Sequence, residues 1–105
     1  MSRYALVTGA SSGIGLALAE ALARRGRNLI LVARKRDALE SIAYELTQRF
    51  SVDVLFRVCD LSEPLQLSGL LHELEQNGQV IELLVNNAGL GLSLIHISEP
   101  TRPER

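Results

Sequence analysis

A glycine-rich stretch near the N-terminus, Val7–Gly15, has residue types and spacing that suit the binding of a phosphate group. It follows an apolar run and precedes an amphipathic run, which predicts a turn between a strand and a helix. Glycines at such a turn let the backbone approach a pyrophosphate closely, and the helix start directs unpaired N–H groups toward the negative charge. A tight turn without a ligand would show the same glycines, so the flanking elements decide between the two interpretations.

Apolar runs and helical stripes alternate along the chain as far as Gly91. The predicted strands are 4–7, 29–32, 52–58 and 83–85. The predicted helices lie at 14–25, through the apolar stripe at 39–46, and at 64–77. Each connection is long enough to contain a helix, so the strands are expected to be parallel. Right-handed crossovers then predict an α/β fold, a Rossmann-like doubly wound parallel sheet with strand order 3-2-1-4.

The two edges of this predicted sheet differ. Strand 52–58 alternates partly between apolar and polar residues, which suits an edge position. Strand 83–85 is entirely apolar, and an exposed apolar edge favours aggregation. We therefore expect a truncated sheet, in which residues 1–91 form part of a larger domain.

Residues 92–105 have a different character and end in prolines and charges. The stretch 92–102 resembles the translation of a transposon-end sequencing adapter. This resemblance implies a non-native tail and a natural protein that continues past Gly91. The alternative is a natural frayed terminus, which many domains have. No fifth strand is predicted here.

Composition limits the classes of function. The chain has 105 residues, a net charge of −1, 47% hydrophobic residues and 4% aromatic residues. One domain at most is expected, with no general attraction to nucleic acid or membranes and no metal-ligand spacing. The single cysteine, Cys59, excludes an internal disulfide and fits a reducing compartment, so a cytoplasmic location is expected.

Three separate motifs resemble those of the short-chain dehydrogenase/reductase family. Thr8–Gly15 resembles its cofactor signature, Asn86–Gly89 its second signature, and Cys59–Leu61 its adenine-contact segment. They occur in the family's order, and the resemblance covers Arg3 to about Gly91.

The resemblance implies a role for each residue of the turn. Gly9 permits the sharp turn, Gly13 lets the phosphates approach, and Gly15 lets the helix pack on the strand. Ser11 and Ser12 offer hydroxyl and N–H groups to phosphate oxygens, and the N–H of Ile14 begins the anion-binding helix end.

The end of the second predicted strand indicates which nicotinamide cofactor is preferred. NAD-binding proteins usually carry Asp or Glu there, whereas this chain has Ala33 followed by Arg34. A guanidinium binds a 2′-phosphate through two hydrogen bonds and stacks on adenine, and Lys35 and Arg36 add positive potential. We therefore predict NADP(H), with NAD(H) second. The alternative is a solvated basic helix start, which conflicts with the helix dipole.

The remaining cofactor contacts follow from the resemblance alone. Asp60 accepts a hydrogen bond from the adenine amino group, and the N–H of Leu61 reaches the ring. Asn86, Asn87, Ala88 and Gly89 line the adenosine ribose and brace the central strands. The alternatives are that Asp60 is a turn or capping residue and that Asn87 is mainly structural.

No residue receives a catalytic role. The family's Tyr-x-x-x-Lys pair is absent, because Lys35 is the only lysine and Leu31 stands four positions before it. The resemblance implies that the parent protein is an NADP(H)-dependent oxidoreductase of a carbonyl or alcohol substrate and a homo-oligomer, and that this chain alone is inactive. The alternative is a non-catalytic dinucleotide-binding sensor or scaffold. A P-loop nucleotide binder is disfavoured, because Gly-Lys-Ser/Thr does not follow the turn.

Overall fold

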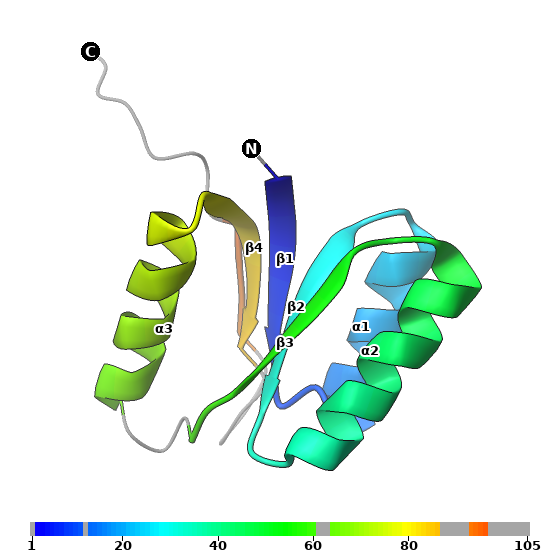
Figure 1. The fold of residues 1–105 in the computed structure, drawn as a ribbon, viewed down its shortest axis with the longest axis horizontal. Coiled ribbons are helices and arrows are strands. Elements are labelled where there is room, and N and C mark those ends of the chain that lie inside the picture. Colours follow the sequence, from blue (N-terminus) through cyan, green and yellow to red (C-terminus); the bar gives the residue numbers. More distant parts are fainter. Residues whose placement is uncertain (1, 12, 61–63, 87–92, 97–105) are drawn as a thin grey trace.

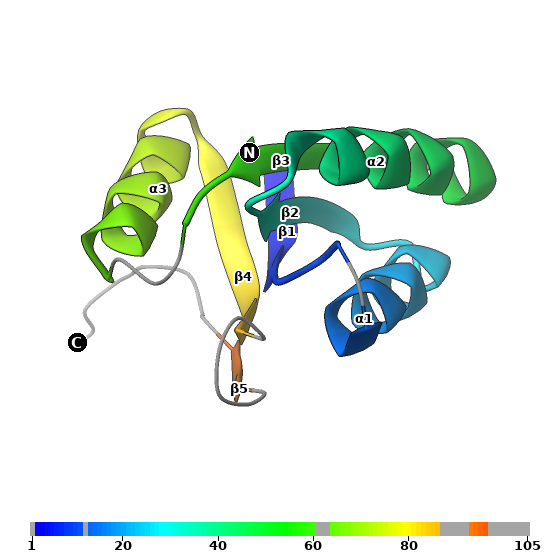
Figure 2. The ribbon, with the colours of Figure 1, turned by 90° about the horizontal axis from the view of Figure 1, so that it is seen from below.

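The computed structural model describes residues 2–11, 13–60, 64–86 and 93–96 of the chain. One five-stranded sheet, in the order β3-β2-β1-β4-β5, has α1 and α2 on one face and α3 on the other (Figures 1 and 2). The strands are β1 Ser2–Thr8, β2 Asn28–Ala33, β3 Val54–Val58, β4 Gln79–Asn86 and β5 Ser93–His96. The helices are α1 Gly13–Arg24, α2 Arg36–Phe50 and α3 Pro64–Gln76. The predicted order 3-2-1-4 of parallel strands is confirmed.

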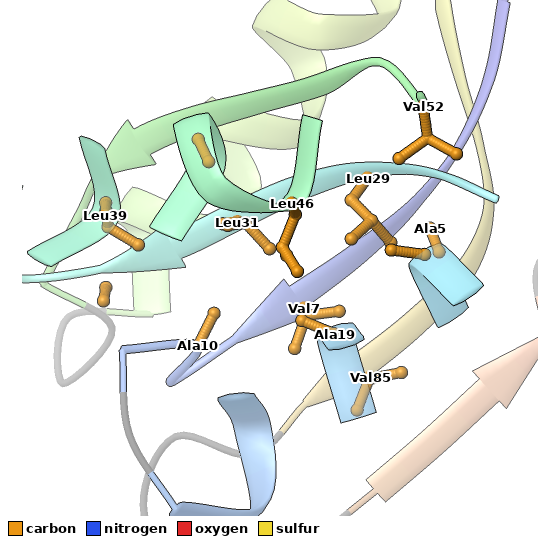
Figure 3. Packing of buried hydrophobic residues seen from close by; sticks show 13 residues of the cluster. Ala5, Val7, Ala10, Ala19, Leu29, Leu31, Leu39, Leu46, Val52 and Val85 are labelled. Atoms are coloured by element: carbon orange, nitrogen blue, oxygen red, sulfur yellow. The ribbon is translucent and has the colours of Figure 1, made fainter. Parts of the chain in front are cut away.

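The central strands are buried on both faces, which explains their continuous apolar sequence. Along β1, Ala5 and Val7 belong to a core beneath α1 and α2, whereas Tyr4 and Leu6 belong to a second core beneath α3. Figure 3 shows the first of these cores. Strand β2 divides its side chains in the same alternating way, so β1 and β2 contribute to both cores.

Strand β4 is longer than the sequence predicted, and a bulge explains the difference. Its register with β1 shifts between Tyr4 and Ala5, which pair with Ile81 and Leu83 and leave Glu82 as an extra residue. Such a bulge resets the alternation of side chains, so Ile81 packs toward α3 while Leu83 packs toward α1 and α2. Glu82 itself forms an ion pair of 2.5 Å with Arg27.

Strand β5 is the element that the sequence did not predict. Ser93–His96 pairs antiparallel with β4, so β4 is not the edge of the described sheet. The physical reason is that an edge strand presents a row of unpaired N–H and C=O groups. Another extended segment can form hydrogen bonds with these groups. Strand β3 does lie at the opposite edge, as predicted.

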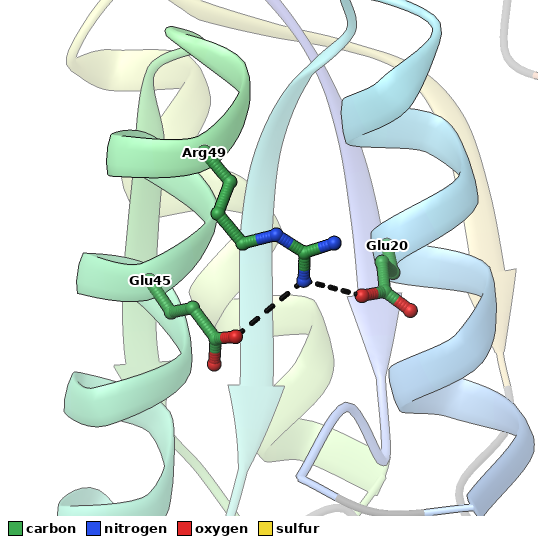
Figure 4. Close-up of polar contacts among 3 residues, drawn as sticks. All are labelled: Glu20, Glu45 and Arg49. Atoms are coloured by element: carbon green, nitrogen blue, oxygen red, sulfur yellow. Dashed lines mark hydrogen bonds and ion pairs between the residues drawn. The ribbon is translucent and has the colours of Figure 1, made fainter.

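Two of the helices are joined by a surface ion network. Arg49 of α2 donates to Glu20 of α1 at 2.6 Å and to Glu45 at 3.4 Å (Figure 4), and the hydrogen bond with Glu20 raises the pKa of Arg49. All three side chains are exposed, so this network contributes little to stability. In the described part of the chain, no helix has both the length and the apolar character to cross a membrane.

The end of α2 carries a strained residue that can be improved. Ser51 has φ 57° and ψ 37°, and its N–H bonds to the Thr47 carbonyl at 3.0 Å. A left-handed conformation costs a non-glycine residue roughly 1–2 kcal/mol, part of which a glycine returns through greater freedom in the unfolded chain. We expect Ser51→Gly to raise the free energy of unfolding by about 0.5–1 kcal/mol in urea titrations. Ser68→Gly, in the interior of α3, is the control and should lower it. A fall with Ser51→Gly would contradict the described helix end.

Candidate functional site

The loops that follow β1 and β3 both attach to the end of β2. The N–H of Ala10, in the turn after β1, donates to the Val32 carbonyl at 3.2 Å. The N–H of Cys59, just after β3, donates to the Ala33 carbonyl at 3.0 Å. Arg34 is the first residue after β2. The glycine turn, Arg34 and the segment after β3 therefore meet at the carboxyl ends of the strands, which lie at the bottom of Figure 1.

The fourth strand is attached to the same end. The hydroxyl of Thr8, which is fully buried, donates to the Val85 carbonyl at 3.3 Å. This bond joins the last residue of β1 to the penultimate residue of β4. Ligands of open α/β sheets bind outside the carboxyl ends of the strands, so this is the place in the fold where a ligand is expected.

The glycine turn has the backbone that its sequence predicted. Gly9 and Gly13 both have φ of +62°, a conformation that favours glycine. Helix α1 begins at Gly13, the side chain of Ile14 is 59% exposed beside it, and Gly15 is buried within the helix. Ser11 is half-buried, and Ser12 lies outside the described residues.

The space beside Gly13 is open, as the motif's role in phosphate binding requires. A Cβ atom built on Gly13 would meet no heavy atom within 4 Å. Glycine is therefore favoured at this position by its φ and not by crowding, and a side chain here would enter open space. The free N–H groups of the first turn of α1 are suited to receive an anion in that space.

These two requirements at Gly13 can be separated by mutation. Asn adopts the left-handed conformation at small cost, but its side chain would enter the open space. We expect Gly13→Asn to leave the thermal midpoint within a few degrees of wild type while weakening NADPH binding by about three- to tenfold. Calorimetric titration and a thermal melt of the same sample measure both quantities. Unchanged affinity would show that the open space is not used.

The three basic residues after β2 have different environments: two have exposed side chains without a described partner, and the third packs on an aromatic ring. The side chains of Arg34 and Lys35 are exposed and make no hydrogen bond or ion pair with any residue that the structure describes. Lys35 also occupies the N-cap of α2 without a side-chain cap bond. The Arg36 guanidinium lies over the ring of Phe56, 5.5 Å from its centroid, so its side chain packs toward β3.

The segment after β3 is fixed by a residue that the sequence analysis missed. The side-chain oxygen of Gln66 accepts from the N–H of Asp60 at 3.0 Å and from the thiol of Cys59 at 3.6 Å. Cys59 is only 8% exposed, and burial followed by the charge of Asp60 raises the pKa of this thiol. No sequence motif identified Gln66, because its partners lie on a different element.

The other predicted contacts are described only in part. Asn86 is the last residue of β4, while Leu61, Asn87, Ala88 and Gly89 lie outside the described residues. His72 is exposed. Across the described ranges, no group of His, Cys, Asp and Glu side chains could hold a metal ion. A depression of about 400 Å³ runs along β3 and is lined by Arg36 and residues 54–58, none of which is a predicted cofactor contact.

Comparison with known proteins supplies an independent finding. A family model described as short chain dehydrogenase matches residues 3–103. An NADP-dependent 3-hydroxy acid dehydrogenase from Schizosaccharomyces pombe is 41% identical over 88 residues, which cover 83% of this chain and 34% of the relative. The human inactive hydroxysteroid dehydrogenase-like protein 1 is 36% identical over 88 residues, which cover 84% of this chain and 26% of the relative.

Solved structures show the same likeness in three dimensions. L-sorbose reductase from Gluconobacter frateurii, complexed with NADPH and L-sorbose, matches with a TM-score of 0.77 and 39% identity, over 86% of this chain and 34% of the reductase. An alcohol dehydrogenase from the archaeon Thermococcus sibiricus, complexed with 5-hydroxy-NADP, matches with a TM-score of 0.75 and 44% identity, over 87% of this chain and 39% of the enzyme. The chain therefore spans about a third of the length of these relatives.

Proposed function

This chain belongs to the short chain dehydrogenase family, and from that premise we propose that the end of its sheet binds NADP(H). The turn Thr8–Gly15 holds the pyrophosphate, Arg34 binds the 2′-phosphate, and Asp60 receives the adenine amino group. Asn86–Gly89 and Leu61 complete the adenosine end of the site. Inside the turn, Ser11, Ser12 and the N–H of Ile14 donate to phosphate oxygens.

The observation that carries this proposal is the attachment of two loops to the end of β2. The hydrogen bonds from Ala10 to Val32 and from Cys59 to Ala33 bring the glycine turn and Asp60 to either side of Arg34. A dinucleotide requires this combination, because its diphosphate, its adenosine 2′-position and its adenine must be bound at once.

Arg34 supports NADP(H) over NAD(H). A carboxylate at this position would repel a 2′-phosphate, whereas a guanidinium forms charge-assisted hydrogen bonds with it. The relatives from S. pombe, G. frateurii and T. sibiricus are named for NADP or complexed with NADPH or an NADP derivative, which agrees with this preference.

For the parent protein we propose an NADP(H)-dependent oxidoreductase of a small carbonyl or alcohol substrate. The bound nicotinamide would supply or receive a hydride, while the residues of this chain bind and orient the adenosine end and the diphosphate. This chain has no Tyr-x-x-x-Lys pair, so we expect no turnover from it alone. A complete sequence without that pair would favour the alternative, a non-catalytic dinucleotide-binding sensor or scaffold.

We further propose that residues 1–91 are the cofactor half of a longer, cytoplasmic and homo-oligomeric protein and that residues 92–105 are a non-native tail. The support for the tail is its resemblance to translated adapter DNA. Resequencing of the source locus tests it, and a genomic segment that encodes Ile95–Ser98 in frame after Gly91 would refute it.

Binding of the nucleotides tests the central proposal directly. In calorimetric titrations of the chain, we expect NADPH to bind more tightly than NADH at equal ionic strength. Equal affinities for NADPH and NADH would refute the proposed contact between Arg34 and the 2′-phosphate. Absence of binding of either nucleotide would refute the site itself. A panel of aldehydes and ketones added with NADPH should show no oxidation of the cofactor by this chain.

A further inference from the structure

Gln66 holds the segment that follows β3 from the side opposite β2. One contact joins the N–H of Cys59 to the Ala33 carbonyl at 3.0 Å. On the other side, the Gln66 side-chain oxygen accepts from the N–H of Asp60 at 3.0 Å and from the Cys59 thiol at 3.6 Å. We propose that Gln66 is a positioning residue that sets where Asp60 stands beside bound adenine, an inference that rests on the proposed function.

The chemistry of the amide fixes its orientation. A carbonyl oxygen has two lone pairs and can accept from both donors at once. The opposite orientation would point an NH₂ group at the N–H of Asp60, and that hydrogen bond would be lost. Because burial and Asp60 raise the pKa of Cys59, its thiol keeps the proton that it donates to Gln66.

The contact of Gln66 links the segment after β3 to helix α3. Among the described strands, β3 lies at the edge of the sheet and pairs with β2 alone. Helix α3 is fixed on the sheet by Leu70 and Leu74, which are 8% and 0% exposed. Gln66 stands one turn before Leu70, so its hydrogen bonds tie Cys59 and Asp60 to a helix that is packed against the sheet.

The test uses a ligand pair that differs at position 6 of the base and, as a consequence, in the proton on the neighbouring N1. Adenosine 2′,5′-bisphosphate carries the amino group at position 6, and inosine 2′,5′-bisphosphate has a carbonyl oxygen in its place. Gln66→Met keeps the length of the side chain and removes the acceptor. We expect it to weaken binding of the adenosine compound by about three- to tenfold and of the inosine compound by less than about twofold.

Two further measurements separate positioning from a general structural effect. Gln76→Met makes the same chemical change at the exposed far end of α3 and should leave both affinities unchanged. Hydrogen exchange of the Asp60 amide should accelerate in Gln66→Met and not in Gln76→Met. Equal losses for the two ligands, unchanged affinity in Gln66→Met, or unchanged exchange of the Asp60 amide would each overturn the inference.

The same experiment distinguishes this inference from the proposed function. If the wild-type chain does not bind adenosine 2′,5′-bisphosphate, the proposed site is wrong and the role of Gln66 falls with it. If the wild-type chain binds and Gln66→Met binds equally well, the site stands and only the role of Gln66 is refuted.

Discussion

Arg34→Ala is expected to weaken NADPH binding by about ten- to a hundredfold and to change NADH binding by less than about threefold. The reason is that Arg34 follows β2 at the point where the loops after β1 and β3 converge. Its guanidinium would form charge-assisted hydrogen bonds with the 2′-phosphate, worth roughly 1.5–3 kcal/mol in total. NADH lacks that phosphate, so it should lose only the stacking of the guanidinium on adenine. Calorimetric titration of both nucleotides measures the difference.

Arg25→Ala is the matched control for this prediction. Arg25 is also exposed and carries the same charge, but it stands after the far end of α1, away from the converging loops. If only general positive charge mattered, both variants would lose the same NADPH affinity. That loss would also become smaller at higher salt concentration in both variants. If Arg25→Ala weakened NADPH binding as much as Arg34→Ala, the preference for NADP(H) would not come from a specific contact.

Much of this site could be predicted because its motif is local. The glycine turn joins one strand to the next helix, and its backbone angles depend on residues that are adjacent in sequence. The positive φ of Gly9 and Gly13 and the helix start at Gly13 agree with that prediction. Similarly, a continuous apolar run such as that of β2 is typical of a strand buried on both faces, and residues 29–33 are all buried.

What could not be predicted depends on contacts between distant elements. The bulge at Glu82 breaks the side-chain alternation of β4, so the sequence pattern indicated only its second half. The pairing of β5 joins Ser93–His96 to β4, and a strand pairing of this kind is not visible in the sequence of either segment. Gln66 contacts Asp60 by a hydrogen bond between two different elements. A glutamine on an exposed helix surface gives no sequence signal of such a contact.

Leu31→Ala is expected to lower the free energy of unfolding by about 2–5 kcal/mol. Leu31 is fully buried in the core beneath α1 and α2, and it pairs with Val7 on one side and Phe56 on the other. Domains of this size are stable by only about 5–15 kcal/mol, so the loss is a large fraction of the total. Urea titration followed by circular dichroism measures it. Leu65→Ala removes the same atoms at a site that is 82% exposed and should change stability by less than about 0.5 kcal/mol.

The two main predictions can be joined in one experiment, because a ligand that binds only the folded state stabilises it. NADPH at about a hundred times its dissociation constant should add about 2.7 kcal/mol to the wild-type chain. It should restore a similar amount to Leu31→Ala, whose binding residues are intact, and much less to Arg34→Ala at the same concentration. If NADPH failed to stabilise Leu31→Ala although the variant still folds, β2 would have to control the geometry around Arg34 directly. If Leu65→Ala and Leu31→Ala lowered the free energy of unfolding equally in the absence of ligand, the described core would be contradicted.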